Sequence, residues 1–167
     1  AFWEDVYISG RPASAPQPEI LTMYDVLKPK PNRPAMVYCE NCRNLEISGI
    51  TLKNSAAYTV WLIGCEEVSL TNLTLRTSLN GPNTDGLDID SCKNVKVSNC
   101  DIITGDDCVA LKSDSARLGR NCPCENILVE NCRFTSTTCG IRIGYEGDSD
   151  IQNCTFRNIE IRNTRHG

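Results

Sequence analysis

Short segments that alternate apolar and polar residues fill most of this chain, and the alternation itself repeats. Five copies of one eleven-residue pattern begin at Cys42, Cys65, Cys92, Cys124 and Ile151. Each copy reads small or apolar, two polar, apolar, any, apolar, polar, Asn or Gly, apolar, any, apolar. The starts are 23, 27, 32 and 27 residues apart, which is typical of solenoid repeats with variable loops. Equivalent side chains of neighbouring copies should therefore stack above one another.

Each copy predicts three short strands. Two come from the pattern itself, whose apolar positions have a period of two, and a third apolar segment follows a variable loop. These third segments are residues 60–62, 87–89, 109–111 and 141–143, with residues 36–39 closing a preceding coil. The Asn or Gly at position eight suits a tight corner, because both tolerate a left-handed φ. The pattern predicts an all-β fold, a single-stranded parallel β-helix of about five coils.

The first 35 residues lack the repeat. We expect a strand at 6–8, a helix or turn at 19–27, and an extended proline-rich linker at 28–34, since proline fixes its own φ and restricts the preceding residue. This divides the chain into an N-terminal segment, 1–35, and a β-helix domain, 36–167. The sequence starts without Met or a signal peptide and ends before a third strand of the last copy. We interpret it as a fragment whose uncapped coils favour self-association.

Composition excludes several classes of protein. Hydrophobic residues make up 40% of the chain and no apolar run reaches 18 residues, so no membrane span is expected. The net charge of −4, without a basic block, disfavours a general nucleic-acid binder. Most of the eleven cysteines occupy fixed repeat positions, which favours columns of buried thiols over disulfides. Cys39 with Cys42, and Cys122 with Cys124, are the best alternative candidates for a disulfide or a metal.

Two variable loops carry the candidate chemistry. Alignment of the third strands stacks Asp85 on Asp107 one coil apart, with Asp106 on the adjoining corner. Crowded carboxylates raise at least one pKa, which allows one acid to donate a proton while another acts as a base. Glycoside hydrolysis needs that combination. Calcium binding, or capping of backbone amides at a corner, is the alternative.

Two outward-facing columns flank these acids. They contain, in order along the stack, Trp61, Asp88, Ala110 and Arg142, and then Ile63, Asp90, Lys112 and Gly144. We expect Lys112 and Arg142 to bind an anionic sugar, with Trp61 as a stacking face. In the alternative, the two cations pair with Asp88 and Asp90 in a surface ladder.

The segments 83–92 and 104–113 contain Asn-Thr-Asp and Gly-Asp-Asp. At this spacing the chain resembles glycoside hydrolase family 28, the polygalacturonases and rhamnogalacturonan hydrolases, over residues 33–167. The resemblance implies a right-handed β-helix that cleaves α-linked galacturonate-type (pectic) polysaccharide with inversion and without a metal or other cofactor. It makes Asp106 the general acid, assigns water activation to Asp85 and Asp107, and gives Asn83 a role in shaping the site. It also implies a secreted or periplasmic protein.

The chain departs from two further motifs of that family. Cys139 stands where Gly-His-Gly has its histidine, and His166 falls in the same column one coil later, either as a substitute or as an ordinary surface residue. The Arg-Ile-Lys motif would follow Gly167. Two other functions therefore stay open: a calcium-dependent β-helical lyase, and a catalytically impaired solenoid that only binds carbohydrate.

Overall fold

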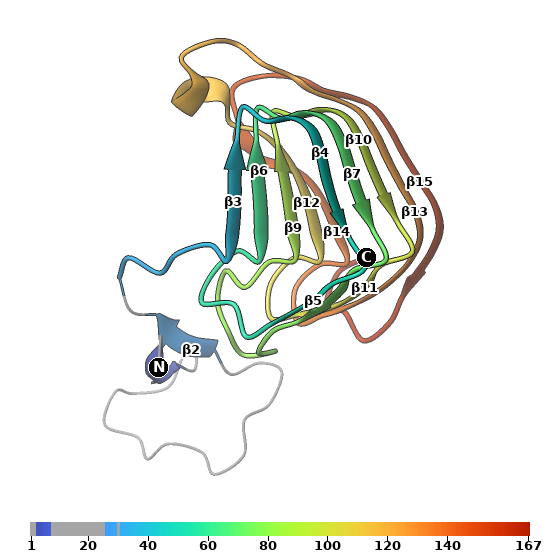
Figure 1. The fold of residues 1–167 in the computed structure, drawn as a ribbon. Coiled ribbons are helices and arrows are strands. Elements are labelled where there is room, and N and C mark those ends of the chain that lie inside the picture. Colours follow the sequence, from blue (N-terminus) through green and yellow to red (C-terminus); the bar gives the residue numbers. More distant parts are fainter. Residues whose placement is uncertain (1–2, 8–25, 30) are drawn as a thin grey trace.

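The computed structural model describes residues 3–7, 26–29 and 31–167. Its strands stack into a curled, ladder-like solenoid (Figure 1). The elements in chain order are β1 (Trp3–Tyr7), β2 (Val26–Pro29), β3 (Val37–Glu40), β4 (Arg43–Ser48), β5 (Thr51–Lys53), β6 (Val60–Ile63), β7 (Glu66–Thr71), β8 (Thr74–Arg76), β9 (Leu87–Asp90), β10 (Lys93–Ser98), β11 (Asp101–Thr104), β12 (Val109–Ser113), the 3₁₀ helix η1 (Ser115–Leu118), β13 (Cys124–Ser136), β14 (Ile141–Gly147) and β15 (Ile151–Ile161).

Two parallel sheets build the solenoid. One has the order β4-β7-β10-β13-β11-β8-β5, with β15 paired to β13, and the other has the order β14-β12-β9-β6-β3. Strand β13 runs through both strand segments of its coil, so it pairs with β10 and with β11. A central coil thus adds one strand to the smaller sheet and two strand segments to the larger one, which confirms the predicted parallel β-helix.

The pairing register confirms the predicted stacking of equivalent residues. Val97 lies between Leu70 and Val129 on neighbouring strands, and all three side chains are fully buried. The core consists mainly of Val, Leu, Ile and Cys. All eleven cysteines are free thiols, and seven of them are buried: Cys65, Cys92, Cys100, Cys108, Cys124, Cys132 and Cys139. This apolar column holds the two sheets together and leaves the variable loops to form the surface.

The corner residues adopt the backbone predicted for them. Asn72, Asn99, Asn131 and Asn158 have φ between 53° and 56°, and Gly49 has φ 67°. Asparagine amides also bond from coil to coil, as Asn158 Nδ2 does to Asn131 Oδ1 at 3.1 Å. A left-handed φ at each corner turns the chain without breaking the stack.

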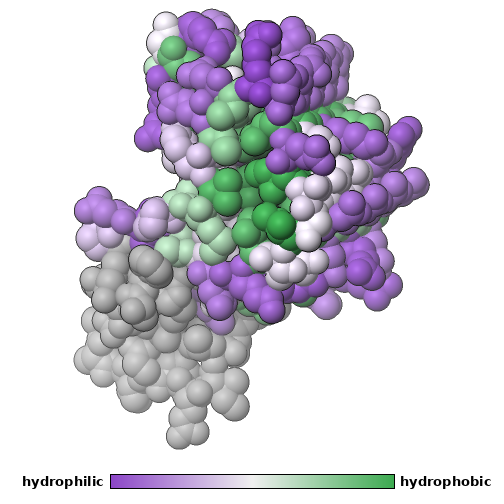
Figure 2. All heavy atoms as spheres, in the orientation of Figure 1, coloured by the Kyte–Doolittle hydropathy of each residue, from purple (hydrophilic) through white to green (hydrophobic). Residues whose placement is uncertain are grey.

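The first coil is less covered than the central ones. Figure 2 shows an apolar surface on the face where β3, β4 and β5 lie. The apolar residues at this end are only partly buried against the core: Val37, Cys39, Cys42, Leu45, Ile47 and Leu52. Self-association through coil ends stays a prediction. This surface is one such end, and Ile159 and Ile161 of the last coil, which are also only partly buried, belong to the other.

The N-terminal strands differ from the expectation. Strands β1 and β2 pair antiparallel, so residues 26 and 27 are extended rather than helical or turn-like. The strand expected at 6–8 begins earlier, at Trp3, and residues 28–29 pair with it instead of forming a bare linker. The remainder of the expected 19–27 element falls outside the described residues. Among the described residues, no helix is long and apolar enough to cross a membrane.

Candidate active site

Backbone hydrogen bonds between coils bring Asp85 and Asp107 together. The loops that carry them lead into β9 and β12, and Gly86 N–H donates to the Asp107 carbonyl at 2.8 Å. A Cβ on Gly86 would lie 2.4 Å from the Cys108 carbonyl oxygen, so the close stacking of these loops requires glycine there. The predicted superposition of Asp85 on Asp107 is therefore present.

Asp106 completes a cluster of three carboxyl groups. Each acid contributes an oxygen, and these oxygens lie within 4.8 Å of one another. Asp85 and Asp107 are 4% exposed, whereas Asp106 is half-buried. The cluster lines an open cavity of about 350 Å³, together with Asn83 and other polar side chains.

Hydrogen bonds fix the orientation of Asp106. Its Oδ2 accepts the backbone N–H of Asn83 at 2.8 Å, and its Oδ1 accepts the Thr138 hydroxyl at 3.1 Å and the Asp107 N–H at 3.1 Å. Burial raises the pKa of Asp106, an effect that the Asn83 N–H opposes. Asp106 is therefore a rigidly held carboxyl group with an increased tendency to keep its proton.

Asp85 is the most isolated of the three acids. Its Oδ1 is buried and has no hydrogen-bond partner within the described part of the chain. Burial, followed by the charges of Asp88 and Asp106, raises the pKa of Asp85 well above its usual range. Asp85, like Asp106, therefore has an increased tendency to keep its proton.

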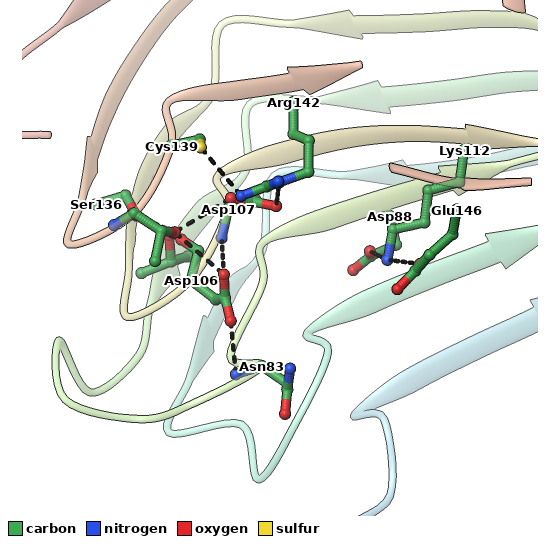
Figure 3. A network of polar contacts seen from close by, with 11 residues as sticks. Asn83, Asp88, Asp106, Asp107, Lys112, Ser136, Cys139, Arg142 and Glu146 are labelled. Carbon is green, nitrogen blue, oxygen red and sulfur yellow. Dashed lines mark hydrogen bonds and ion pairs between the residues drawn. The ribbon is translucent and has the colours of Figure 1, made fainter. Parts of the chain in front are cut away.

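Two cations line the cavity, and each already has an acidic partner. Arg142 donates through Nε to Asp107 and through Nη2 to Cys139 Sγ, the latter at 3.2 Å. Lys112 lies between two carboxylates, with its Nζ 2.8 Å from Asp88 and 3.1 Å from Glu146. Figure 3 shows both arrangements side by side. Of the alternative surface ladder, the pairing of Lys112 with Asp88 is confirmed, although Lys112 is buried. The pairing of Arg142 with Asp88 or Asp90 is wrong, because Arg142 pairs with Asp107 of the cluster.

The predicted column of Lys112 and Gly144 is also wrong. Strands β12 and β14 pair regularly up to Leu111 and Ile143, and pairing resumes at Ser113 and Gly147. Strand β14 therefore contains two residues more than β12 between these points. The bulge carries Tyr145 and Glu146 to the cavity wall, a consequence of pairing that the repeat pattern does not contain.

Of the remaining predicted residues, one lines the cavity and two do not. Asn83 lines the cavity, and Arg33 Nη2 donates to its side-chain oxygen at 3.0 Å. His166 is exposed, bridges Cys139 through the backbone as its column predicts, and does not line the cavity. Trp61 packs against Tyr58, with ring centroids 5.3 Å apart, and is not part of the lining either.

The sequence analysis missed Tyr58 and Thr138. Tyr58 lines the cavity, and burial raises its pKa to about 12. Neither residue belongs to an acidic motif. Both residues lie one coil from the acids in the stack. Thr59, the neighbour of Tyr58, bonds to Asp85 through the backbone, and Cys139, the neighbour of Thr138, bonds to Cys108, the neighbour of Asp107. Alignment of the coils is the signal that could have identified them.

The three acids are also a possible metal site, because among the described residues they form the cluster whose ligand atoms lie close enough together to hold an ion. Carboxylate oxygens suit Ca²⁺ or Mg²⁺. The guanidinium of Arg142, however, already occupies one oxygen of Asp107. The expectation of metal-free chemistry stays a prediction.

Comparison with known proteins identifies the family of this chain. The model of the glycosyl hydrolases family 28 matches residues 23–167, so the chain belongs to that family. It is 29% identical over 160 residues to a probable polygalacturonase of Arabidopsis thaliana, covering 82% of this chain and 35% of the relative. It is 28% identical over 148 residues to a polygalacturonase of Medicago sativa, covering 74% and 35%.

Two solved structures of polygalacturonases share the fold of this chain. A hyperthermoactive exopolygalacturonase from Thermotoga maritima superposes with a TM-score of 0.63 at 32% identity, covering 80% of this chain and 32% of that one. The family 28 exopolygalacturonase of Yersinia enterocolitica superposes with a TM-score of 0.61 at 22% identity, covering 78% and 24%. The fold is thus the right-handed parallel β-helix of these enzymes. The chain spans between about a quarter and about a third of the length of these proteins.

Proposed function

We propose that this chain carries the catalytic acids of a hydrolase that cleaves α-linked galacturonate-type, pectic polysaccharide. One observation carries the proposal: three carboxyl groups lie within 4.8 Å of one another in an open cavity that also holds two cations. Family membership supports a hydrolase over a lyase, and a site so rich in titratable groups supports catalysis over binding alone.

In this proposal Asp106 is the general acid. It faces the cavity, and burial raises its pKa, both of which suit a group that must give a proton to the glycosidic oxygen. The hydrogen bonds from Asn83 and Thr138 hold the carboxyl group in place before substrate arrives. Asn83 therefore acts on the reaction by positioning Asp106.

Asp107 and Asp85 activate the attacking water. Arg142 stabilises the negative charge that Asp107 must carry to accept a proton from that water. Asp85 lies one rung away and offers an unpartnered oxygen as the second acceptor. It accepts a proton only when it is ionised, and its raised pKa then makes it the stronger base. Inverting enzymes that use two carboxyl groups separate them by roughly 6.5–9.5 Å. Here three acids share these roles: the water lies between Asp85 and Asp107, and Asp106 protonates the leaving group.

Release of reducing ends from polygalacturonate tests the hydrolase, with neutral galactan as the comparison polymer. A lyase would instead form unsaturated products that absorb in the ultraviolet and would need calcium. Proton NMR of the first product tests the stereochemistry, because inversion of an α-linkage yields the β-anomer. Retention of the α-configuration would contradict the proposed roles of Asp85 and Asp107.

Polymer substrates lie outside the cell, so we also propose a secreted or periplasmic location.

A further inference from the structure

The cavity contains a fourth carboxylate, an exposed one, that the reaction does not need. Glu146 lines the same cavity as the three catalytic acids. Its Oε2 lies 3.1 Å from the ammonium of Lys112, and 46% of its side chain is exposed. A carboxylate at this place adds repulsion to any anionic sugar that enters, so its presence in a site for a polyanion requires an explanation.

The two carboxylates on Lys112 differ in how firmly they are held. Asp88 is fully buried, and the side chain of Lys112, which lines the cavity, is only 7% exposed, so their 2.8 Å ion pair is shielded from solvent. The ring of Tyr58, whose centroid is 4.6 Å from Nζ, covers a further side of the ammonium. Breaking a buried ion pair is costly, whereas a half-exposed one contributes little. Glu146 is therefore the partner that another anion can replace.

The bulge in β14 delivers Glu146 to this position. The two additional residues lie where Gly144 and Tyr145 have φ of 84° and 80°, and Gly147 has φ 140°. A regular strand would place Gly144 beside Lys112. Left-handed backbone at a non-glycine residue costs free energy, and its result here is a carboxylate on the exposed side of a buried cation.

Arg142, the other cation of the cavity, has a different role. Its guanidinium binds Asp107, and its carbon Cζ lies 5.2 Å from the ring centroid of Tyr145. Displacing Arg142 would remove the cation that supports a catalytic base. Lys112 is thus the cation in this cavity that can exchange its partner on the Glu146 side without losing the cation that supports Asp107.

We propose that Glu146 occupies the place of a substrate carboxylate, and that a uronate group of the sugar replaces it on Lys112. This inference rests on the proposed pectic substrate and identifies the residue that selects it. The exchange keeps the number of negative charges around Lys112 constant, because Glu146 moves into solvent as the uronate binds. A neutral sugar has no group that can make the exchange, so Lys112 keeps Glu146 and the uronate is favoured.

Binding of monomeric galacturonate and of uncharged galactose, measured by titration calorimetry, tests the exchange. Replacement of Glu146 by Ala removes the competing carboxylate. Galacturonate should then bind about five- to tenfold more tightly, the factor expected if Glu146 occupies Lys112 for about 80–90% of the time. Galactose affinity should not change. Glu146→Gln should give a smaller gain, because its amide oxygen still accepts a bond from Lys112.

The matched control is Glu46→Ala, which removes an exposed carboxylate from β4 on the other sheet and should leave both affinities unchanged. Unchanged or weaker galacturonate binding by Glu146→Ala overturns the inference, and so does an equal gain for galactose. The absence of galacturonate binding by every variant overturns it as well. Hydrolysis of polygalacturonate is measured separately: affinity gain without hydrolysis contradicts the proposed function alone, and hydrolysis without affinity gain contradicts this inference alone.

Discussion

Lys112 forms its ion pair diagonally across two strands, with Asp88 rather than with the residue directly opposite. The register of β9 and β12 places Lys112 opposite Asp90 and Asp88 opposite Ala110. The ammonium nevertheless lies 2.8 Å from Asp88, and both side chains are buried. Asp90 instead accepts the backbone N–H of Asp114 at 2.8 Å. The diagonal pair fixes a positive charge in the wall of the cavity that the three acids line.

Loss of this cation should destabilise the fold. Burial alone would lower the pKa of Lys112, but Asp88 raises it, so the lysine is held as a cation. Lys112→Met leaves Asp88 buried without its partner and should lower the free energy of unfolding by about 3–5 kcal/mol. Urea denaturation measures the change. The double variant Lys112→Met with Asp88→Leu should recover most of the loss, and equal stability of both variants would contradict the role of the pair.

Replacement of the proposed general acid should abolish turnover and leave the fold intact. Asp106→Asn keeps the shape of the side chain but cannot donate the proton, so the rate on polygalacturonate should fall at least about a hundredfold. Reducing-end assays measure the rate, and circular dichroism checks the fold. More than a tenth of the original rate would remove Asp106 from the role of acid.

The pH profile of the rate should depend on Arg142. The rate falls at high pH when Asp106 loses its proton, and the charge of Arg142 lowers the pKa of Asp106. Arg142→Leu should therefore move the alkaline limb to higher pH. It should also lower kcat by about tenfold or more, because a hydrogen bond to a charged group contributes about 1.5–3 kcal/mol. Arg142→Lys keeps the charge and should keep the limb in place. A shift of the limb to lower pH in the Leu variant would refute this electrostatic role.

The corner asparagines should tolerate glycine better than alanine. Asn131 has φ 56°, a conformation that costs a residue with a β-carbon roughly 1–2 kcal/mol. Asn131→Ala should therefore lower the melting temperature more than Asn131→Gly does. Differential scanning calorimetry compares the two, and an equal effect would assign the stability to the amide ladder with Asn158 rather than to the backbone.

The exposed end of the solenoid should cause self-association of the 167-residue chain. Among the described residues, β3, β4 and β5 have no strand on their outer side, and Leu45 and Ile47 are only partly buried. Sedimentation velocity should show species larger than the monomer that diminish on dilution. Leu45→Lys should reduce the association, because a charge at an exposed edge opposes pairing. A monomer at all concentrations would refute the prediction.

The repeat pattern predicted the stack because each rung has a fixed length and a fixed apolar period. Asp85 and Asp107 could be superposed from sequence, since each precedes a third strand by the same interval. His166 and Cys139 were likewise placed in one column, which the bridge between them confirms. The position of Glu146 could not be predicted, because a bulge changes pairing without changing the apolar period.

The sequence by itself determined the coil, its corners and the rung that carries the three acids, because these follow from local periodicity and from residues that accept a left-handed φ. Only the tertiary structure decided which charges neutralise one another. Lys112 pairs with Asp88 and Glu146, and Arg142 with Asp107. Long side chains choose partners by reach and burial in three dimensions, and neither quantity is contained in the repeat.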